Sequence, residues 1–409
     1  MPLAKPLGLV SLLLRDPSSY QPVRVDMNSP VLPNTNDSPP NGLKPTEHQA
    51  GDAEAQGNTF TSAPIVADTF TDEDSEFASE GSDLTSLSSS ILEYEYENGR
   101  RYHTSYRAYC AAEAYRLMKL RMPNDEEEQD RMDLTHHMSV LLAPSWKSAS
   151  LIETKTRWLL LMRGELHKAP INNPQKVLDL GTGTGIWALD FAEKYPMASI
   201  IGNDISAIQP NWVPPNVEFV VEDFESEWIY EPSSFDFIHA RLLAGCVSDW
   251  PQLFNCCYDH LKPGAYFEIQ ESAVWAWSDD GTCPPDSPIF ELLRAMDMAS
   301  NAIGKPYNVY PYLRQWLIEA GFEDVNQFVY FLPYSPWPKD PYLKELGKFQ
   351  AAMVQHAIEA YSLRLFTQVL GWGEDVSKIF QASVKKQLRD KHMHAYVKEY
   401  VIYGRKPLR

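Results

Sequence analysis

Three glycines at alternate positions are the residues of this chain best suited to chemistry with a ligand. Gly181, Gly183 and Gly185 follow the short apolar run 176–180, and residues with a helical pattern come after them. Glycine lets the backbone turn sharply and approach a ligand closely. Ligands of open α/β sheets bind outside the carboxyl ends of strands, where this loop belongs. The pattern predicts a ligand site that includes Asp179; a tight turn without a ligand is the alternative.

The spacing of these glycines distinguishes two kinds of nucleotide site. A dinucleotide-binding loop needs the pattern G-x-G-x-x-G or G-x-G-x-x-A. Counting from Gly181, the sixth position is Ile186, so the pattern that remains is G-x-G-x-G. The sequence therefore disfavours a nicotinamide-dependent oxidoreductase.

Two acids follow the next two predicted strands. Asp204 ends the apolar run 198–203, where an acid can accept hydrogen bonds from both ribose hydroxyls of a nucleoside. Its alternative role is a helix N-cap. Asp223 and Phe224 follow the third run, where a carboxylate can accept from an adenine amino group and a ring can pack near the base. The alternative there is a surface turn.

A fourth apolar run, 235–240, leads to His239 and Arg241. The exit of this strand faces the substrate side of such a pocket, where histidine can act as a base and arginine can bind a carboxylate. Each also has a structural alternative. His239 can be a hydrogen-bonded core histidine, and Arg241 can pair with an acid of the same domain.

The elements that must position these residues alternate along the chain. Strands are expected at 176–180, 198–203, 217–221, 235–240 and 265–270, with helices at 187–194 and 251–261. Such alternation implies βαβ units, and right-handed crossovers make the sheet doubly wound. With two late strands, 325–330 and 396–405, we expect an α/β fold with a seven-stranded, mostly parallel sheet. Further helices are expected at 289–303, 312–320, 342–370 and 376–391, as a helical lid within 272–395 that is inserted after the fifth strand.

The first 170 residues differ from the α/β domain expected at 171–409. Residues 1–90 carry 13 Asp or Glu against 4 Lys or Arg, and 10 of the 31 prolines. We expect them to be a disordered acidic tail, because they cannot bury enough apolar surface to offset the entropy of ordering. A helical cap segment is expected at 91–170, with helices at 106–122, 126–142 and 151–166.

Composition excludes several classes of protein. The net charge is −19, which repels phosphate backbones, so we expect no direct nucleic-acid binding. No run approaches the roughly 20 apolar residues that cross a bilayer, and the run 7–14 lacks the cleavage site of a signal peptide. None of the five cysteines belongs to a C-x-x-C pair, so we expect no metal site and free thiols in a cytoplasmic or nuclear protein.

Residues 176–271 resemble the class I S-adenosylmethionine (SAM)-dependent methyltransferases. Four motifs carry this resemblance in order: the glycine loop, Asp204, Asp223 and the fifth-strand signature LKPGAYFE at 261–268. A narrower resemblance is to the fungal LaeA-like group with a trans-aconitate-methyltransferase domain. It rests on residues 97–103, 123–126, 133–134, 136–137, 371–372 and 403–407.

The resemblance implies roles for the residues that match the family motifs. The glycines, with Asp179 before them, would line the methionine part of SAM, and Asp204 would hold the ribose. Asp223 and Phe224 would contact the adenine. It also implies that Arg101, Tyr102 and His103 fold over the cofactor.

The resemblance further implies methyl transfer from SAM to an unidentified acceptor in fungal secondary metabolism. Such transfer needs an aligned acceptor and no metal; the expected base is His239 or His103, with Arg241 orienting the acceptor. The chain is either an enzyme with a small-molecule acceptor or a regulator that acts through protein partners. An aromatic acceptor pocket, or else ordinary packing, is expected from Trp275, Trp277, Tyr307, Tyr310, Trp337 and Trp372.

Overall fold

The computed structural model describes most of the carboxyl-terminal part of the chain and a few residues before it. All of them fall within the larger of the two units into which the chain divides, Gly51–Arg409. The described residues are 161–409 together with 65, 94–97, 100–103, 126 and 129.

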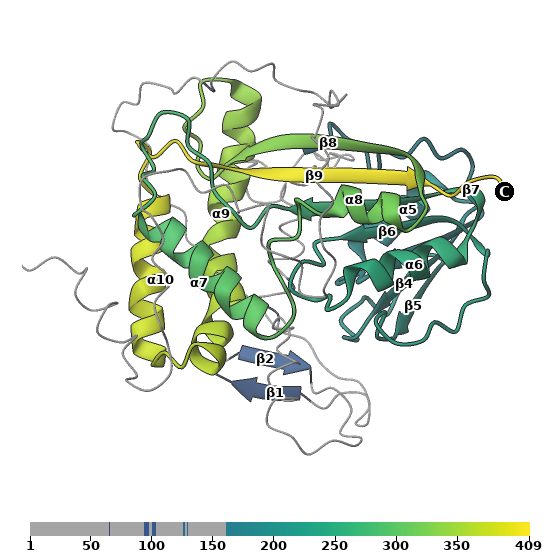
Figure 1. The fold of residues 1–409 in the computed structure, drawn as a ribbon, viewed down its shortest axis with the longest axis horizontal. Helices are drawn as coiled ribbons and strands as arrows, with labels where there is room; N and C mark the ends of the chain where they lie inside the picture. Colours follow the sequence, from purple (N-terminus) through teal and green to yellow (C-terminus); the bar gives the residue numbers. More distant parts are fainter. Residues whose placement is uncertain (1–64, 66–93, 98–99, 104–125, 127–128, 130–160) are drawn as a thin grey trace, which may run out of the picture. The chain divides into compact units, whose positions relative to one another are not determined.

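Seven strands in the described part of the chain form one sheet in the order β5-β4-β3-β6-β7-β9-β8 (Figure 1). The pairs from β5 to β7 are parallel, whereas β9 runs antiparallel to both of its neighbours. The expected seven-stranded, mostly parallel sheet is therefore confirmed. Its strands are β3 (Lys176–Leu180), β4 (Ser199–Asp204), β5 (Val217–Val221), β6 (Phe235–Arg241), β7 (Leu261–Ser272), β8 (Glu323–Pro333) and β9 (Tyr396–Arg405).

Helices cover both faces of the sheet because neighbouring side chains of a strand point to opposite sides. In β3, Val177 joins a hydrophobic cluster with Trp187, whereas the next residue, Leu178, joins a second cluster with Phe254. The sheet is thus doubly wound. The first cluster is formed with α5 (Ile186–Lys194), and the second with α6 (Trp250–His260) and α8 (Leu313–Glu319).

A third hydrophobic cluster forms the helical lid. Leu292, Ile358, Phe366 and Val384 belong to it, one from each of the four helical elements α7, α9, η1 and α10. Two segments of the chain form the lid: one follows β7, and the other lies between β8 and β9 (Figure 1). The lid helices are α7 (Pro288–Ala302), α9 (Pro341–Arg364), the π-helix η1 (Leu365–Val369) and α10 (Glu374–Leu388).

The segment expected to be a helical cap contains a β-hairpin. β1 (Tyr94–Glu97) pairs antiparallel with β2 (Arg100–His103). The reason is visible in the sequence, where tyrosine alternates with glutamate and Asn98-Gly99 is the pair that two-residue hairpin loops favour. The helical expectation is therefore wrong for these eight positions.

Two helix ends also differ from the expected bounds. The helix expected at 151–166 has its last helical residue at Leu161, since Arg163 and Gly164 turn with φ values of 56° and 86°. The helix expected to include Leu261 ends at His260, because Leu261 pairs with Phe235 and begins β7. The helix expected at 106–122 lies outside the described residues, as does that at 126–142 except for 126 and 129, which are helical.

Candidate functional site

A cavity of about 340 Å³ lies where the carboxyl ends of the parallel strands meet the lid helices. Seven of the residues predicted to serve the site line its wall, and they come from loops far apart in the sequence. This convergence supports the rule that ligands bind at the carboxyl ends of strands in such sheets. The predicted residues on the wall are Asp179, Gly181, Gly183, Asp204, Asp223, Phe224 and Arg241.

The glycine loop is held tightly against its neighbours. Gly181 and Gly183 have φ values of 61° and 59°, a backbone region that favours glycine. A Cβ atom at Gly181 would lie 2.5 Å from Leu243 Cδ2, so a larger residue would have to displace the Leu243 side chain of the loop that follows β6. The Thr182 amide donates to the Asn203 carbonyl at 2.8 Å, which ties the loop to β4.

Asp204 and Asp223 reach the cavity from the ends of β4 and β5. One oxygen of Asp204 accepts from the Gly183 amide and the other from the Ser206 amide, each at 2.9 Å. Asp223 accepts from the Glu225 amide at 3.1 Å, so it also shapes its own turn. Asp223 therefore combines the predicted position with the turn that was its alternative, whereas Asp204 shapes a loop and caps no helix, because no helix lies between β4 and β5.

His239 does not line the cavity. Its ring is fully buried and stacks on Trp187, with centroids 3.7 Å apart and planes at 2°. Nδ1 donates to Asp179 Oδ1 at 2.7 Å, while Thr182 Oγ1 donates to Asp179 Oδ2 at 2.6 Å. Burial lowers the pKa of His239, so the imidazole is neutral. The structure thus assigns it the alternative role, a core histidine that positions Asp179, and not that of a base.

Gly185 also lies off the cavity wall. It precedes α5 with a φ of 84°, and a Cβ atom there would lie 2.2 Å from Phe219 Cζ. Its predicted contact with a cofactor is therefore replaced by close packing of α5 against the ring of Phe219.

The predicted residues of β2 cannot be assigned to the cavity. Arg101, Tyr102 and His103 belong to the hairpin, and the structure describes their backbone but not their side chains. Their expected place over the cofactor, and the role of His103 as a base, stay predictions.

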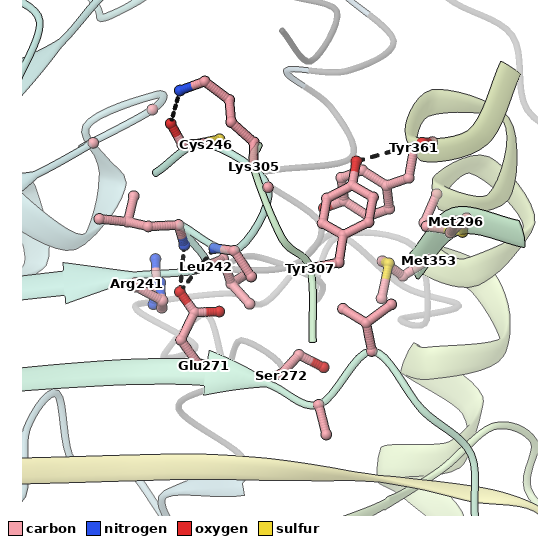
Figure 2. Close-up of a pocket in the computed structure, with 18 of the residues that line it drawn as sticks. Arg241, Leu242, Cys246, Glu271, Ser272, Met296, Lys305, Tyr307, Met353 and Tyr361 are labelled. Carbon is pink, nitrogen blue, oxygen red and sulfur yellow. Dashed lines mark hydrogen bonds between the residues drawn. The ribbon is translucent and has the colours of Figure 1, made fainter. Parts of the chain in front are cut away.

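Half of the cavity lies beneath the lid, and of its residues Tyr307 was predicted to line an acceptor pocket (Figure 2). Glu271 closes it at the end of β7, Tyr307 stands in the middle, and Met296 and Met353 reach in from α7 and α9. An acid at the carboxyl end of a parallel strand is the signal that found Asp204, and it would also have found Glu271. No periodicity marks the lid residues, because separate helices bring them together.

The expected aromatic pocket is mostly wrong. Of its six residues, Tyr307 lines the cavity; the other five are not part of its wall. Trp277 stacks near Tyr396 at 6.4 Å, and Trp372 lies 4.6 Å from Phe366 within the lid core. Packing within the core, the alternative interpretation, accounts for them.

No cluster of three His, Cys, Asp or Glu side chains suited to a metal occurs in the described ranges. Four of the cysteines, Cys246, Cys256, Cys257 and Cys283, are free thiols there. Within the same ranges no helix has the length and apolar character that a membrane span requires.

The site can now be compared with known proteins. Residues 155–327 match a family model described as a methyltransferase domain. Methyltransferase pytC of Aspergillus terreus is 38% identical over 80% of this chain and 92% of that protein. The secondary metabolism regulator LAE1 of Cochliobolus heterostrophus is 34% identical over 76% of this chain and 94% of that protein.

Further similarities agree with these. The protein-methionine methyltransferase laeA of Emericella nidulans is 32% identical over 80% of this chain and 80% of that protein. Among solved structures, phosphoethanolamine N-methyltransferase 2 of Haemonchus contortus covers 61% of this chain and 52% of its own, with a TM-score of 0.36 and 19% identity, too low to carry an argument. The chain belongs to the fungal methyltransferase family that includes pytC and the LaeA proteins.

Proposed function

We propose that the cavity binds S-adenosylmethionine and that the protein transfers its methyl group to a small-molecule acceptor of secondary metabolism. One observation carries the proposal: the glycine loop, Asp204, Asp223 and Phe224 line one cavity although three different strands deliver them. The relatives pytC and LAE1, a methyltransferase and a regulator of secondary metabolism by name, support the biological setting.

The residues present fit the parts of this cofactor. Backbone at Gly181 and Gly183 would lie along the methionine part, with the negative charge of Asp179 near its ammonium group. A carboxylate offers about four acceptor sites, so Asp204 can receive ribose hydroxyls in addition to its two backbone amides. Asp223 and Phe224 would contact the adenine. When bound, the cofactor supplies an electrophilic methyl group, and the protein must align the acceptor and exclude water.

Calorimetric titration with SAM tests the proposal. We expect micromolar affinity in the parent protein, no binding of NAD, and a loss of roughly tenfold or more in Asp204→Ala, since a hydrogen bond to a charged group contributes about 1.5–3 kcal/mol. Asp236→Asn is the matched control, because Asp236 binds Lys262 and two amides at the amino end of β6 and is not part of the cavity wall. A parent protein that binds NAD and not SAM would end the proposal.

A regulatory function is the second candidate, because several relatives bear the name of secondary metabolism regulators. In that case the protein binds SAM and acts through protein partners. Metabolite profiles distinguish the two functions, if a deletion strain is compared with a strain that carries Asp179→Ala and Gly181→Ala. Loss of one methylated compound indicates a pathway enzyme, and loss of many unrelated compounds indicates a regulator.

A further inference from the structure

The half of the cavity beneath the lid is mostly apolar, with Gln350 of α9 as a buried polar side chain on its wall. Side chains from α7 and α9 form most of its wall, and Tyr307 and Tyr361 add two rings (Figure 2). The apolar wall includes Leu292, Leu293, Met296, Met353, Val354 and Ile358. Such a surface gains free energy by covering an apolar ligand.

Glu271 is a carboxyl group at the floor of this apolar half. It is 1% exposed, and one oxygen accepts hydrogen bonds from the amides of Leu243 and Ala244, the latter at 3.1 Å. The other oxygen, Oε2, is buried and has no hydrogen-bond partner among the described residues. Burial of a carboxyl oxygen without a hydrogen-bond partner costs folding free energy, so this oxygen needs an explanation.

The loop after β6 fixes Glu271 at the junction of the two halves. Leu243, whose amide binds Glu271, also packs against Gly181 of the glycine loop. Gly245, two residues later, lies so close to Tyr307 that a Cβ atom would be 1.9 Å from its ring. Leu242 has a φ of 55°, a conformation that costs a leucine on the order of 1 kcal/mol or more. The half of the cavity that the glycine loop lines is here called the cofactor half. The strained loop after β6 therefore brings Glu271 together with the cofactor half and with the apolar half beneath the lid.

We propose that Glu271 binds the methyl acceptor through Oε2, and that the acceptor is a bulky apolar molecule with a hydroxyl or amine at the methylated atom. This rests on the proposed function. In the transfer, the O–H or N–H bond of the acceptor breaks and its proton goes to Oε2. The electron pair of that acceptor atom forms the new bond to the methyl carbon, and the pair of the broken C–S bond stays on sulfur. In its ionised form, this carboxylate also repels acceptors that carry several carboxylates.

The surroundings of Glu271 suit a base that works at mildly alkaline pH, where its carboxyl group is ionised. Burial, with the nearby Glu399 of β9, raises its pKa to about 8, while the amides of Leu243 and Ala244 oppose the rise. Arg241 at the end of β6 and Lys305 are the cations that line the same cavity. Proton transfer is most efficient when the pKa of the base lies near the working pH.

Binding of simple probes tests the proposal without the natural acceptor. At about pH 8.5, where Glu271 is mostly ionised, protein saturated with S-adenosylhomocysteine is titrated with 2-naphthol, with 2-methoxynaphthalene, which has the same ring system but no donor, and with trans-aconitate. We expect 2-naphthol to bind about tenfold more tightly than 2-methoxynaphthalene, since a hydrogen bond to a carboxylate contributes at least that factor. Trans-aconitate should not bind. In Glu271→Gln the ratio of the affinity for 2-naphthol to that for 2-methoxynaphthalene should fall to about one.

Two variants make the test specific. Glu268→Gln is the matched control, because Glu268 is equally buried on the same strand but is not part of the cavity wall. The ratio of the two affinities in this variant should equal that of the parent. Glu271→Asp keeps the acid on a shorter side chain and should retain part of the preference. Affinity of Glu271→Gln for S-adenosylhomocysteine should stay within about twofold of the parent, which separates this proposal from the cofactor site. An unchanged preference in both Glu271 variants, or no binding of either naphthalene, would overturn it.

Discussion

Asp179 owes its orientation on the cavity wall to two side chains that the ligand would not touch. Thr182 and His239 each hold one of its oxygens, and Trp187 fixes the plane of the imidazole. A buried carboxylate with both oxygens bound is locked in place, so its negative charge faces the cavity in one direction. The strength of the cofactor site should therefore depend on His239, although His239 does not line it.

His239→Phe tests this dependence. The ring can still stack on Trp187, but the hydrogen bond to Asp179 is lost. Because such a bond to a charged group contributes about 1.5–3 kcal/mol, we expect calorimetry to show about tenfold weaker SAM binding. His260→Ala is the control, since its ring contacts the Cys256 carbonyl within α6. Unchanged affinity in His239→Phe would show that Asp179 keeps its place without the histidine.

Gly185→Ala should affect stability and not binding. The new methyl group would lie against Phe219, and the φ of 84° disfavours alanine. We expect the free energy of unfolding to fall by about 2 kcal/mol, with SAM affinity within about threefold of the parent. Urea denaturation measures the first quantity, and Phe219→Leu in the same chain should restore part of it. A large loss of affinity at unchanged stability would return Gly185 to the cofactor site.

The residues of the cofactor half were predictable because one local rule covers them. Acids and glycines that follow apolar runs mark the carboxyl ends of parallel strands, and this rule located Asp179, Asp204 and Asp223 without any tertiary information. The same rule was applied to His239. However, the side chain of a residue just before the end of a strand points either into the core or toward the ligand. The sequence alone does not distinguish these two orientations.

At the scale of elements, β7 carries two buried glutamates that each fix a separate loop. Glu268 accepts from the amides of Lys168 at 2.7 Å and Ala169 at 2.6 Å, which ties the segment before β3 to the sheet. Glu271 holds the loop after β6 in the same way. The strand thus fixes two loops, of which the one after β6 lines the cavity.

These two glutamates predict an unusual dependence of stability on pH. Burial raises the pKa of Glu268 to about 7 and that of Glu271 to about 8, from 4.5. Above pH 4.5 the folded state therefore holds protons that the unfolded state has released, so each group contributes stability that declines as pH rises through its folded pKa. The free energy of unfolding should fall between pH 5 and 8, by on the order of 3 kcal/mol for each group.

Urea denaturation at pH 5, 7 and 9 measures this decline. In Glu271→Gln and Glu268→Gln the decline should be smaller than in the parent, because glutamine does not titrate. Other carboxylates contribute equally to all three proteins, so the difference from the parent isolates one group. Equal slopes in the parent and both variants would mean that neither glutamate holds a proton near neutral pH.

Secondary-structure elements were predicted well where the local sequence determines them. The alternation of apolar runs located all seven strands of the sheet, and register with neighbours then extended β7 and β8 beyond the expected ends. The hairpin of β1 and β2 was missed because the helical pattern after residue 106 was extended backward over it. The lid depends on packing among α7, α9 and α10, which no single segment encodes.

At the scale of the whole molecule, charge and composition separate the amino-terminal 90 residues from the α/β domain. Ile65 is the residue among them that the structure describes, and it is half-buried against the lid cluster, unlike a solvated tail; for the others the expected disorder stays a prediction. Their 13 acids against 4 basic residues cannot support a hydrophobic core of their own. A net charge of −19 also opposes contact with nucleic acid.

Deletion of residues 1–60, which keeps Ile65 on the lid cluster, should therefore leave the domain intact. We expect the melting temperature to change by less than about 2 °C and SAM affinity by less than about twofold, because a solvated tail contributes little packing. Differential scanning calorimetry and titration measure both. A drop of about 5 °C or more, which corresponds to roughly 1 kcal/mol or more, would show that the tail packs on the domain.

The position of β9 has a consequence for how the protein is made. This strand is synthesised after both of its neighbours, yet it lies between β7 and β8 and pairs with both. Until β9 has emerged from the ribosome, the nascent chain holds β8 with no neighbour in the sheet, an exposed edge that favours association with other chains. Emergence of β9 thus closes the sheet, and a stop codon before codon 396 should yield a product that chaperones retain and proteases remove.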